Sequence, residues 1–262
     1  MASSFWNGEF YFDSIHSSKY KVCIIDFNSS DIVKQIGGNF SISTEKDNSY
    51  RNNLLYRETE YMSENITLQL CKTDKQPWNI ADILNINGWL FQESFKKFQP
   101  TDFDNQGYNI IYYLKAIDMK KFFNTNMEGY IEVTFQSYDG FAYIVPNINI
   151  VINGNETRTV VNQSNINKKY YPKIKITNWG DSTNVITITN STTGDELVIS
   201  GMENNEVITI DCAIGSVVNT SGVNRFEVLQ NFNFIGLAKG NNTITLSPNC
   251  SASFICEFPI IL

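Results

Sequence analysis

The chain has 262 residues, of which 42% are hydrophobic and 18% are charged, and its formal net charge is −7. This length suffices for two ordinary domains, each with an apolar core. Its basic residues form no run, and the densest spots are isolated pairs such as Lys96-Lys97 and Lys120-Lys121. A phosphate-binding surface needs several adjacent cations, so the composition argues against nucleic-acid binding.

The N-terminal residues MASSFWNGEFYFD lack a basic flank and a long apolar run, so no secretory signal is expected. No apolar stretch has the length needed to cross a bilayer, and no membrane insertion is expected. We therefore expect the protein to fold in a cytosol. Its cysteines are odd in number and widely spaced, and are interpreted as small buried side chains, with a Cys250–Cys256 disulfide as the alternative. They are Cys23, Cys71, Cys212, Cys250 and Cys256.

The first segments of the chain are typical of β-structure. Phe5 to Phe12 alternates aromatic and polar residues around Asn7-Gly8, which predicts a hairpin. Tyr20 to Phe27 and Ile66 to Cys71 are predicted strands. Between them, residues 37–62 contain two β-type runs around the polar turn EKDNSYRNN, which predicts a long hairpin projecting from the domain.

One segment has a helical pattern. Asn79 is a good N-cap, and Asp82 stands three residues later, as in a capping box. We expect Trp89 to anchor this helix in the core of its domain. The predicted apolar face follows at helical spacing and comprises Ile80, Ile83, Leu84, Asn87, Leu90 and Phe91.

Strands return after the helix. Tyr108 to Ile117 is an aromatic strand, and Gly129 to Ser137 alternates as a half-buried strand does. One helix among many strands predicts an α+β first domain over residues 1–140. From about Tyr143, short β runs are separated by turns such as Ser191 to Gly194, which predicts an antiparallel β-sandwich over residues 141–262.

The sequence offers few residues for catalysis. His16 is the single histidine and lies in a polar turn, so it is interpreted as an exposed turn residue. Metal-ligand and nucleotide-binding spacings do not occur, so we assign no catalytic residue, metal or cofactor. Asp102-Phe103-Asp104 could bind calcium, but a solvated turn is favoured.

Two sets of residues keep other functions open. Paired acids could hydrolyse glycosides, although strand edges or loops are the favoured interpretation; the candidates are Glu203, Glu206 and Asp211. Aromatic side chains could stack on sugars, although core or interface packing is favoured; the candidates are Tyr170, Tyr171 and Trp179.

Several motifs follow one another in a defined order. A helix ending in Trp89-Leu90 precedes the strand Tyr108 to Ile117 and the strand Gly129 to Phe135. The second half contains GMENNEVITID (Gly201 to Asp211) and FNFIGLAKGNNTIT (Phe232 to Thr245). With these motifs in this order, the chain resembles the phage distal tail proteins. A Pro-Pro pair common in that family is replaced here by the junction Tyr138-Asp139-Gly140.

The resemblance implies a structural protein of the virion tail tip, assembled in the bacterial host cytoplasm and without enzymatic activity. Its first domain would form a homohexameric ring through a belt hairpin, and its second would be a galectin-like sandwich. The implied partners are the tail tube protein, the tail-associated hub protein, the tape measure protein and receptor-binding proteins. In the predicted hairpin, exposed apolar residues would form the ring interface: Leu54, Leu55, Tyr56 and Tyr61.

Two alternatives come from other functional classes. One is a carbohydrate-binding adhesin or receptor-binding protein of the tail tip, with the sugar site in the second domain. The other is a tail-borne cell-wall hydrolase.

Overall fold

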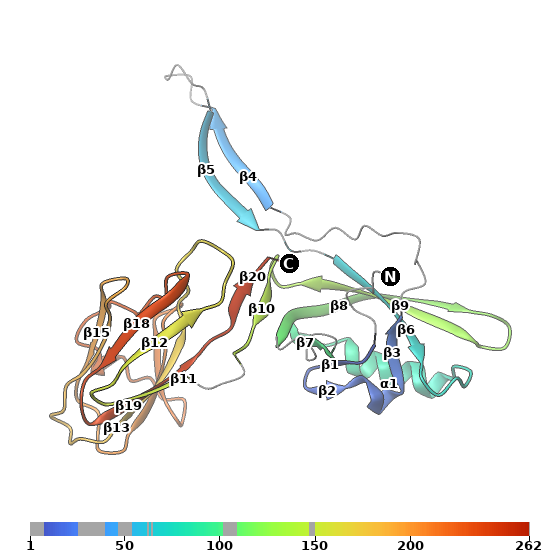
Figure 1. Ribbon diagram of the computed structural model, residues 1–262. Helices are drawn as coiled ribbons and strands as arrows, with labels where there is room; N and C mark the ends of the chain where they lie inside the picture. Colours follow the sequence, from blue (N-terminus) through green and yellow to red (C-terminus); the bar gives the residue numbers. More distant parts are fainter. Residues whose placement is uncertain are drawn as a thin grey trace. The chain divides into compact units, whose positions relative to one another are not determined.

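The computed structural model describes residues 8–25, 40–46, 54–61, 63, 65–101, 109–146 and 150–261. The chain divides into two compact units, one formed by Met1–Tyr143 with Ile261–Leu262 and the other by Ile144–Ile260. Antiparallel strands dominate both units, and the described residues contain one α-helix (Figure 1). The predicted fold class, mostly β with an α+β first part and a β-sandwich second part, is confirmed.

The main sheet of the first unit has the strand order β2-β1-β7-β8-β9-β6-β3, and β10 pairs with β8 beside it. Gly8, just before β1, exchanges backbone hydrogen bonds of 3.1 and 2.8 Å with Ile24, so this part of the chain pairs with the outer edge of β3. The strands are β1 (Phe10–Phe12), β2 (Ile15–His16), β3 (Val22–Ile25), β6 (Asn65–Lys72), β7 (Lys96–Pro100), β8 (Ile110–Phe123), β9 (Gly129–Ser137) and β10 (Ala142–Ile144).

The core of this unit contains Trp89 from α1 (Ile80–Leu90). Trp89 is 3% exposed, and its indole Nε1 donates a 3.1 Å hydrogen bond to the carbonyl of Phe12. Its ring stacks on Tyr20 of η1 (Ser17–Tyr20) at 4.6 Å and on Phe10 at 5.4 Å. Trp89 therefore connects the helix to the first strand and to the 3₁₀ turn, and its indole nitrogen has a partner inside the core.

Helix α1 begins where the sequence predicts. The Asn79 side chain accepts from the backbone N–H of Asp82, and the Asp82 carboxylate accepts from the backbone N–H of Asn79. The predicted buried face is partly wrong. Ile80 and Leu84 are 73% and 64% exposed, and the face that packs inward comprises Ile83, Ile86, Trp89 and Leu90. The burial of the Trp89 indole fixes this rotation of the helix.

One strand prediction is corrected, and another falls partly outside the described residues. The tight turn of the first strands lies at Asp13-Ser14, where both residues have positive φ, whereas the predicted turn at Asn7-Gly8 falls partly outside the described residues. Strand β8 continues beyond Ile117 to Phe123 and pairs with β9 throughout. Its last residues are mostly exposed and lack the alternation that marks a half-buried strand.

Strands β4 (Phe40–Lys46) and β5 (Leu54–Tyr61) form a separate antiparallel sheet. Their register runs from Phe40 opposite Tyr61 to Lys46 opposite Leu54, with a shift between Ser43 and Thr44. Both strands lie within residues 37–62, where the sequence predicts a hairpin. The side chains of the four predicted interface residues of β5 lie outside the described part of the structure.

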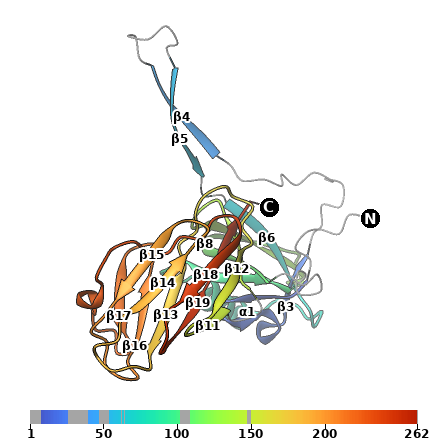
Figure 2. The ribbon, with the colours of Figure 1, turned by 60° about the vertical axis from the view of Figure 1, so that its left-hand side comes forward.

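The second unit contains two antiparallel sheets, ordered β11-β19-β13-β16-β17 and β12-β18-β14-β15 (Figure 2). Inward-facing side chains of both sheets form one apolar cluster, including Ile174, Ile188 and Ile208, so the unit is a β-sandwich. Their strands are β11 (Ile150–Asn153), β12 (Thr157–Asn162), β13 (Lys173–Asn178), β14 (Ile186–Asn190), β15 (Asp195–Ile199), β16 (Val207–Asp211), β17 (Ser216–Asn219), β18 (Gly240–Leu246) and β19 (Cys250–Ile255). Strand β20 (Phe258–Ile260) follows and belongs to neither of these two sheets.

One segment, residues 223–231, covers an edge of each of these sheets, and we call it the edge strap. It contains the 3₁₀ helix η3 (Phe226–Val228). On β17, the Arg225 N–H donates to the carbonyl of Val217 at 2.9 Å. On β15, the Gln230 N–H donates to the carbonyl of Val198 at 2.9 Å. The strap thus pairs backbone groups that would otherwise be open to another strand.

Buried asparagines join loops to the core of the second unit. Asn162, Asn178, Asn190 and Asn242 are each at most 2% exposed, and each side-chain amide bonds to the backbone. Asn178 Nδ2 donates to the carbonyl of Met202 at 2.8 Å, and its Oδ1 accepts from the N–H of Gly180 at 3.0 Å. Part of the high asparagine content therefore stabilises loops in place of regular secondary structure.

We expect Trp89→Ala to lower the stability of the first unit by about 3–5 kcal/mol, because it removes a large buried ring and leaves a cavity. The matched control is Trp179→Ala, since Trp179 is 49% exposed. Chemical denaturation followed by circular dichroism compares the two. Equal midpoints for Trp89→Ala and Trp179→Ala would contradict the packing described for α1.

Asn178→Ala should lower the stability of the second unit by about 1–3 kcal/mol, because backbone groups buried around the amide lose their partner. Asn204→Ala is the control, since Asn204 is exposed and donates to the carbonyls of Trp179 and Gly180 in the same loop region. Thermal melts measure both. A smaller loss for Asn178→Ala than for Asn204→Ala would show that the buried amide is dispensable.

Candidate assembly surfaces

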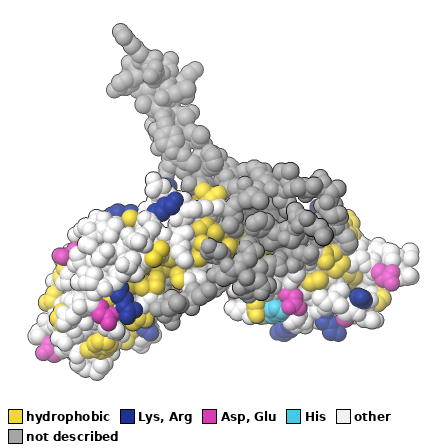
Figure 3. All heavy atoms as spheres, in the orientation of Figure 1, with side chains coloured by type: hydrophobic (Ala, Val, Ile, Leu, Met, Phe, Trp, Pro, Cys, Tyr) yellow, Lys and Arg dark blue, Asp and Glu magenta, His cyan; other side chains and the backbone are white. Residues whose placement is uncertain are grey.

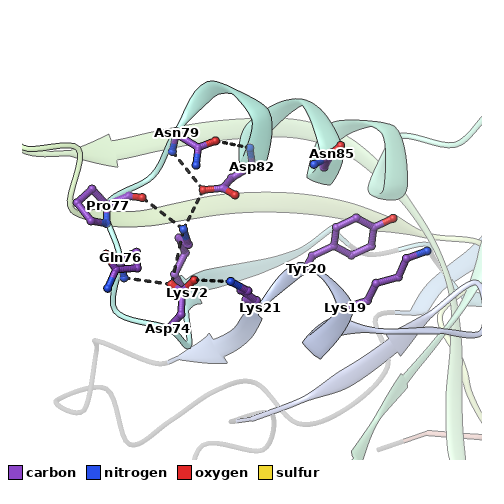
Figure 4. A pocket seen from close by; sticks show the side chains of 10 residues that line it. All are labelled: Lys19, Tyr20, Lys21, Lys72, Asp74, Gln76, Pro77, Asn79, Asp82 and Asn85. Carbon is purple, nitrogen blue, oxygen red and sulfur yellow. Dashed lines mark hydrogen bonds and ion pairs between the residues drawn. The ribbon is translucent and has the colours of Figure 1, made fainter.

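A polar cavity of about 450 Å³ lies beside the start of α1 (Figure 4). Lys72 is its central charge, with a side chain that is only 7% exposed. The Lys72 ammonium donates to the carboxylate of Asp82 at 2.8 Å and to the carbonyl of Pro77 at 3.3 Å, and it lies 3.6 Å from the carboxylate of Asp74. The buried cation is therefore fully engaged by groups of its own chain.

The acids of this cavity also have structural partners. Asp82 is part of the capping box of α1. Asp74 accepts from the backbone N–H of Gln76 at 3.0 Å, and this hydrogen bond lowers the pKa of the Asp74 carboxyl, with a further contribution from Lys21. The arrangement fixes the connection between β6 and α1, and we assign it a structural role.

His16 is a capping residue rather than the exposed turn residue expected from the sequence. It lies at the end of β2, half-buried, and its Nδ1 accepts from the backbone N–H of Ser18 at 3.3 Å and lies 2.7 Å from the Ser18 hydroxyl. Its ring meets Tyr11 edge-on at 4.6 Å, and its Nε2 lies 3.5 Å from the Glu9 carboxylate. These contacts begin the 3₁₀ turn η1.

The acids considered for glycoside hydrolysis are bound in local contacts. Glu206 accepts from the backbone N–H of Glu203 at 2.9 Å and from Arg225 Nη2 at 3.1 Å. Asp211 lies 3.2 Å from the ammonium of Lys173 on the neighbouring strand. These contacts agree with the interpretation of these acids as loop and strand-edge residues.

Within the described ranges, no group of three or more His, Cys, Asp or Glu side chains could hold a metal ion. No described helix is long and apolar enough to cross a membrane. The turn Asp102-Phe103-Asp104, considered above for calcium, lies outside the described residues.

The three aromatic residues proposed for sugar stacking do not form one platform. Tyr170 is largely buried, its hydroxyl accepts from the backbone N–H of Glu257 at 2.8 Å, and burial raises its pKa. Tyr171 and Trp179 are 40% and 49% exposed. They flank β13 at its two ends, and eight residues of extended chain separate them by about 25 Å.

A different aromatic surface lies near the end of the edge strap. Phe226 and Phe232 are 42% and 62% exposed and stack with ring centroids 5.3 Å apart. Phe232 also borders a shallow cavity of about 380 Å³ with Tyr171 and Phe234. We call these four residues the aromatic patch. Sequence reasoning missed it because isolated loop phenylalanines have no periodicity that marks them as neighbours.

The first unit also exposes apolar side chains, and hydrophobic atoms are visible on both units in Figure 3. Ile80 and Leu84 lie one helical turn apart on α1. At the end of the β8–β9 hairpin, Phe122 is 43% exposed and stacks on Tyr130 at 4.8 Å. Exposed apolar groups of this kind are common at protein–protein contacts.

Family models match nearly the whole chain. The model described as phage tail protein N-terminal domain matches residues 6–139, and the model described as phage tail C-terminal domain matches residues 141–256. The chain belongs to this family of phage tail proteins. None of the curated proteins compared with this phage tail protein matches it.

Solved structures share its fold. The Dit (gp 19.1) protein of phage SPP1 matches with a TM-score of 0.69 and 12% identity, over 95% of this chain and 98% of that one. A chain of the activated phage P2 baseplate with Ca matches with a TM-score of 0.56 and 11% identity, over 96% and 98% of the two chains. The same baseplate with Sr gives 0.55 and 12%, with the same coverage. The fold expected from the resemblance to phage distal tail proteins is thus confirmed.

Proposed function

We propose that this phage tail protein is a structural component of the tail tip, where copies of it form a hexameric ring between the tail tube and the adsorption apparatus. The observation that carries the proposal is the fold shared with the SPP1 Dit protein over 95% of this chain and 98% of that one. That SPP1 protein is described as a paradigm of the hub adsorption apparatus in phages that infect Gram-positive bacteria.

A closed ring of identical chains needs two different surfaces that fit each other head to tail. Strands β4 and β5 form a sheet of only two strands, and such a sheet is marginally stable in isolation. Docking on a neighbouring copy would pair its edges and stabilise it. We propose that this hairpin is the belt of the ring, with an apolar interface of Leu54, Leu55, Tyr56 and Tyr61.

On β15 and β17, association of the second unit through strand pairing is disfavoured, because the edge strap already covers these two edge strands. Its aromatic patch would instead contact other tail components through side chains. The proposed partners are the tail tube, tail-associated hub, tape measure and receptor-binding proteins. In this proposal the chain is assembled in the bacterial host cytoplasm, resides in the virion tail tip, and acts without catalysis, cofactor, direct nucleic-acid binding or membrane insertion.

The ring predicts a salt-tolerant assembly. The net charge of −7 per chain opposes association, so apolar burial must outweigh the repulsion, and added salt screens that repulsion. Light scattering coupled to size exclusion should show a hexamer at low and high salt, alone or with the tail tube protein. A monomer under all these conditions would refute the ring.

Variants test the belt. Replacing Leu54, Leu55, Tyr56 and Tyr61 with Ser, or deleting residues 45–55, should abolish the hexamer while the second unit keeps its melting transition. The matched control replaces Val161 and Val185 with Ser, since both are about half exposed on the second unit. A belt variant that remains hexameric would show that the ring uses another surface.

Carbohydrate recognition is a second candidate function, and the aromatic patch is the observation that favours it. Exposed rings beside a shallow cavity can stack on sugar faces. On a glycan array, the full chain should then give a signal that Phe232→Ala removes and Trp179→Ala retains. Absence of any signal, or equal loss in both variants, would remove this candidate.

A further inference from the structure

Two cysteines of the first unit lie directly opposite each other on neighbouring strands. Cys23 of β3 and Cys71 of β6 are register partners in the antiparallel pair. Both are free thiols, and both are partly exposed. In the sequence they are 48 residues apart, and this spacing does not predict that they are neighbours.

The backbone hydrogen bonds define the geometry of this pair. The backbone N–H and C=O of Ile24 both bond to Gly8, so these two groups point away from β6. Two residues before Cys23, the Lys21 carbonyl accepts from the Thr73 N–H at 2.8 Å, so Lys21 and Thr73 are a hydrogen-bonded pair. Cys23 and Cys71 therefore occupy a hydrogen-bonded site, where opposed Cα atoms are about 5.5 Å apart. A disulfide requires a Cα separation of about 4.4–6.8 Å. The Cβ atoms of such a pair must approach somewhat, and the Cys71 thiol must leave the Gly129 carbonyl, to which it donates at 3.6 Å. Both requirements make the bond comparatively easy to reduce.

The remaining cysteines lack such a partner. Cys250 and Cys256 are separated by extended chain along β19, about 20 Å in length, which rules out the disulfide considered from the sequence. Cys212 and Cys256 follow β16 and β19, which lie on opposite sides of β13. Their Cα atoms are therefore two strand spacings apart, about 10 Å in total, which is too far for a disulfide. Burial raises the pKa of the Cys212 and Cys256 thiols to about 12.

We propose that Cys23 and Cys71 are a redox-active dithiol that closes to a disulfide when the folded chain meets a small-molecule disulfide. One cysteine thiolate attacks a sulfur of the oxidant, forming a mixed disulfide and releasing one small thiol. The other cysteine then attacks the protein sulfur of the mixed disulfide, which forms the Sγ–Sγ bond and releases the second small thiol. The two protons of the cysteines pass to the released thiolates, and the small disulfide is the species reduced.

The position of this dithiol gives it a structural consequence. Strand β3 leads into residues 26–64 and β6 follows them, so the new bond closes a loop that contains β4 and β5. The disulfide would thus fasten the two strands from which the proposed belt departs. In a reducing cytosol the dithiol stays open during assembly, and it closes in an oxidising environment outside the cell. That this disulfide would stabilise the base of a ring-forming hairpin rests on the proposed function.

The pKa of both thiols is raised, chiefly by burial, with Glu9 adding to the effect at Cys23 and Cys23 adding to it at Cys71. The reactive thiolates are therefore scarce near neutral pH, and closure should speed up as the pH rises.

The test uses the reduced full-length protein, incubated with oxidised glutathione at about pH 8.5, near the ordinary pKa of a thiol. Alkylation, intact mass and peptide mapping should show the loss of two free thiols and a peptide that joins Cys23 to Cys71. The melting temperature of the first unit should rise by roughly 5–10 °C, and dithiothreitol should reverse the change. Cys23→Ser and Cys71→Ser should each abolish the shift, and Cys250→Ala should retain it.

Three results would overturn the inference: both thiols remain alkylatable, only glutathione adducts form, or the bond joins two chains on a non-reducing gel. Alkylation, mass and peptide mapping report on the two cysteines whether or not the chain forms a ring. If the disulfide forms and no ring is found, the dithiol stands and the proposed function fails. If a ring is found and no disulfide forms, the proposed function stands and the dithiol proposal fails.

Discussion

Unpaired backbone groups at the edges of β-sheets are the constraint on which this structure depends, because each N–H and C=O must find a partner or water. In the second unit, the edge strap covers β15 and β17 with its own backbone hydrogen bonds. In the first, Gly8 pairs with Ile24 on the outer edge of β3. The two-stranded sheet β4–β5 pairs with no third strand among the described residues, and for this reason we propose it as the place where a neighbouring copy docks.

The first unit shows how one side chain orients a helix on such a sheet. Trp89 packs between Phe10 and Tyr20 and donates to the Phe12 carbonyl. Rotation of α1 would therefore break the ring stacking and the hydrogen bond. This rotation leaves Ile80 and Leu84 at the surface. The polar network around Lys72 then fixes the start of the helix. The charged groups around Lys72 thus stabilise the fold, and Ile80 and Leu84 remain exposed on α1.

Local signals in the sequence were sufficient for some elements and insufficient for others. Asn79 and Asp82 predicted the start of α1, because a capping box needs only neighbouring residues. The buried face of α1 was missed because Ile80 and Leu84 are as apolar as Ile83 and Ile86, and only tertiary packing distinguishes them. The aromatic patch and the Cys23–Cys71 pair depend on loop packing and strand register, which join residues far apart in the chain. The role of His16 as a cap depends on the turn that brings the Ser18 N–H to its Nδ1, and the residue type alone does not reveal this turn.

The central claim is that a chain with this fold closes into a ring by repeating one head-to-tail contact. Electron microscopy of the purified protein mixed with the tail tube protein of the same phage tests it most directly, because class averages display symmetry without any assumption about the interface. We expect closed rings with six-fold symmetry, bound at the end of the tube. Isolated single chains, or open filaments that do not close, would contradict the claim.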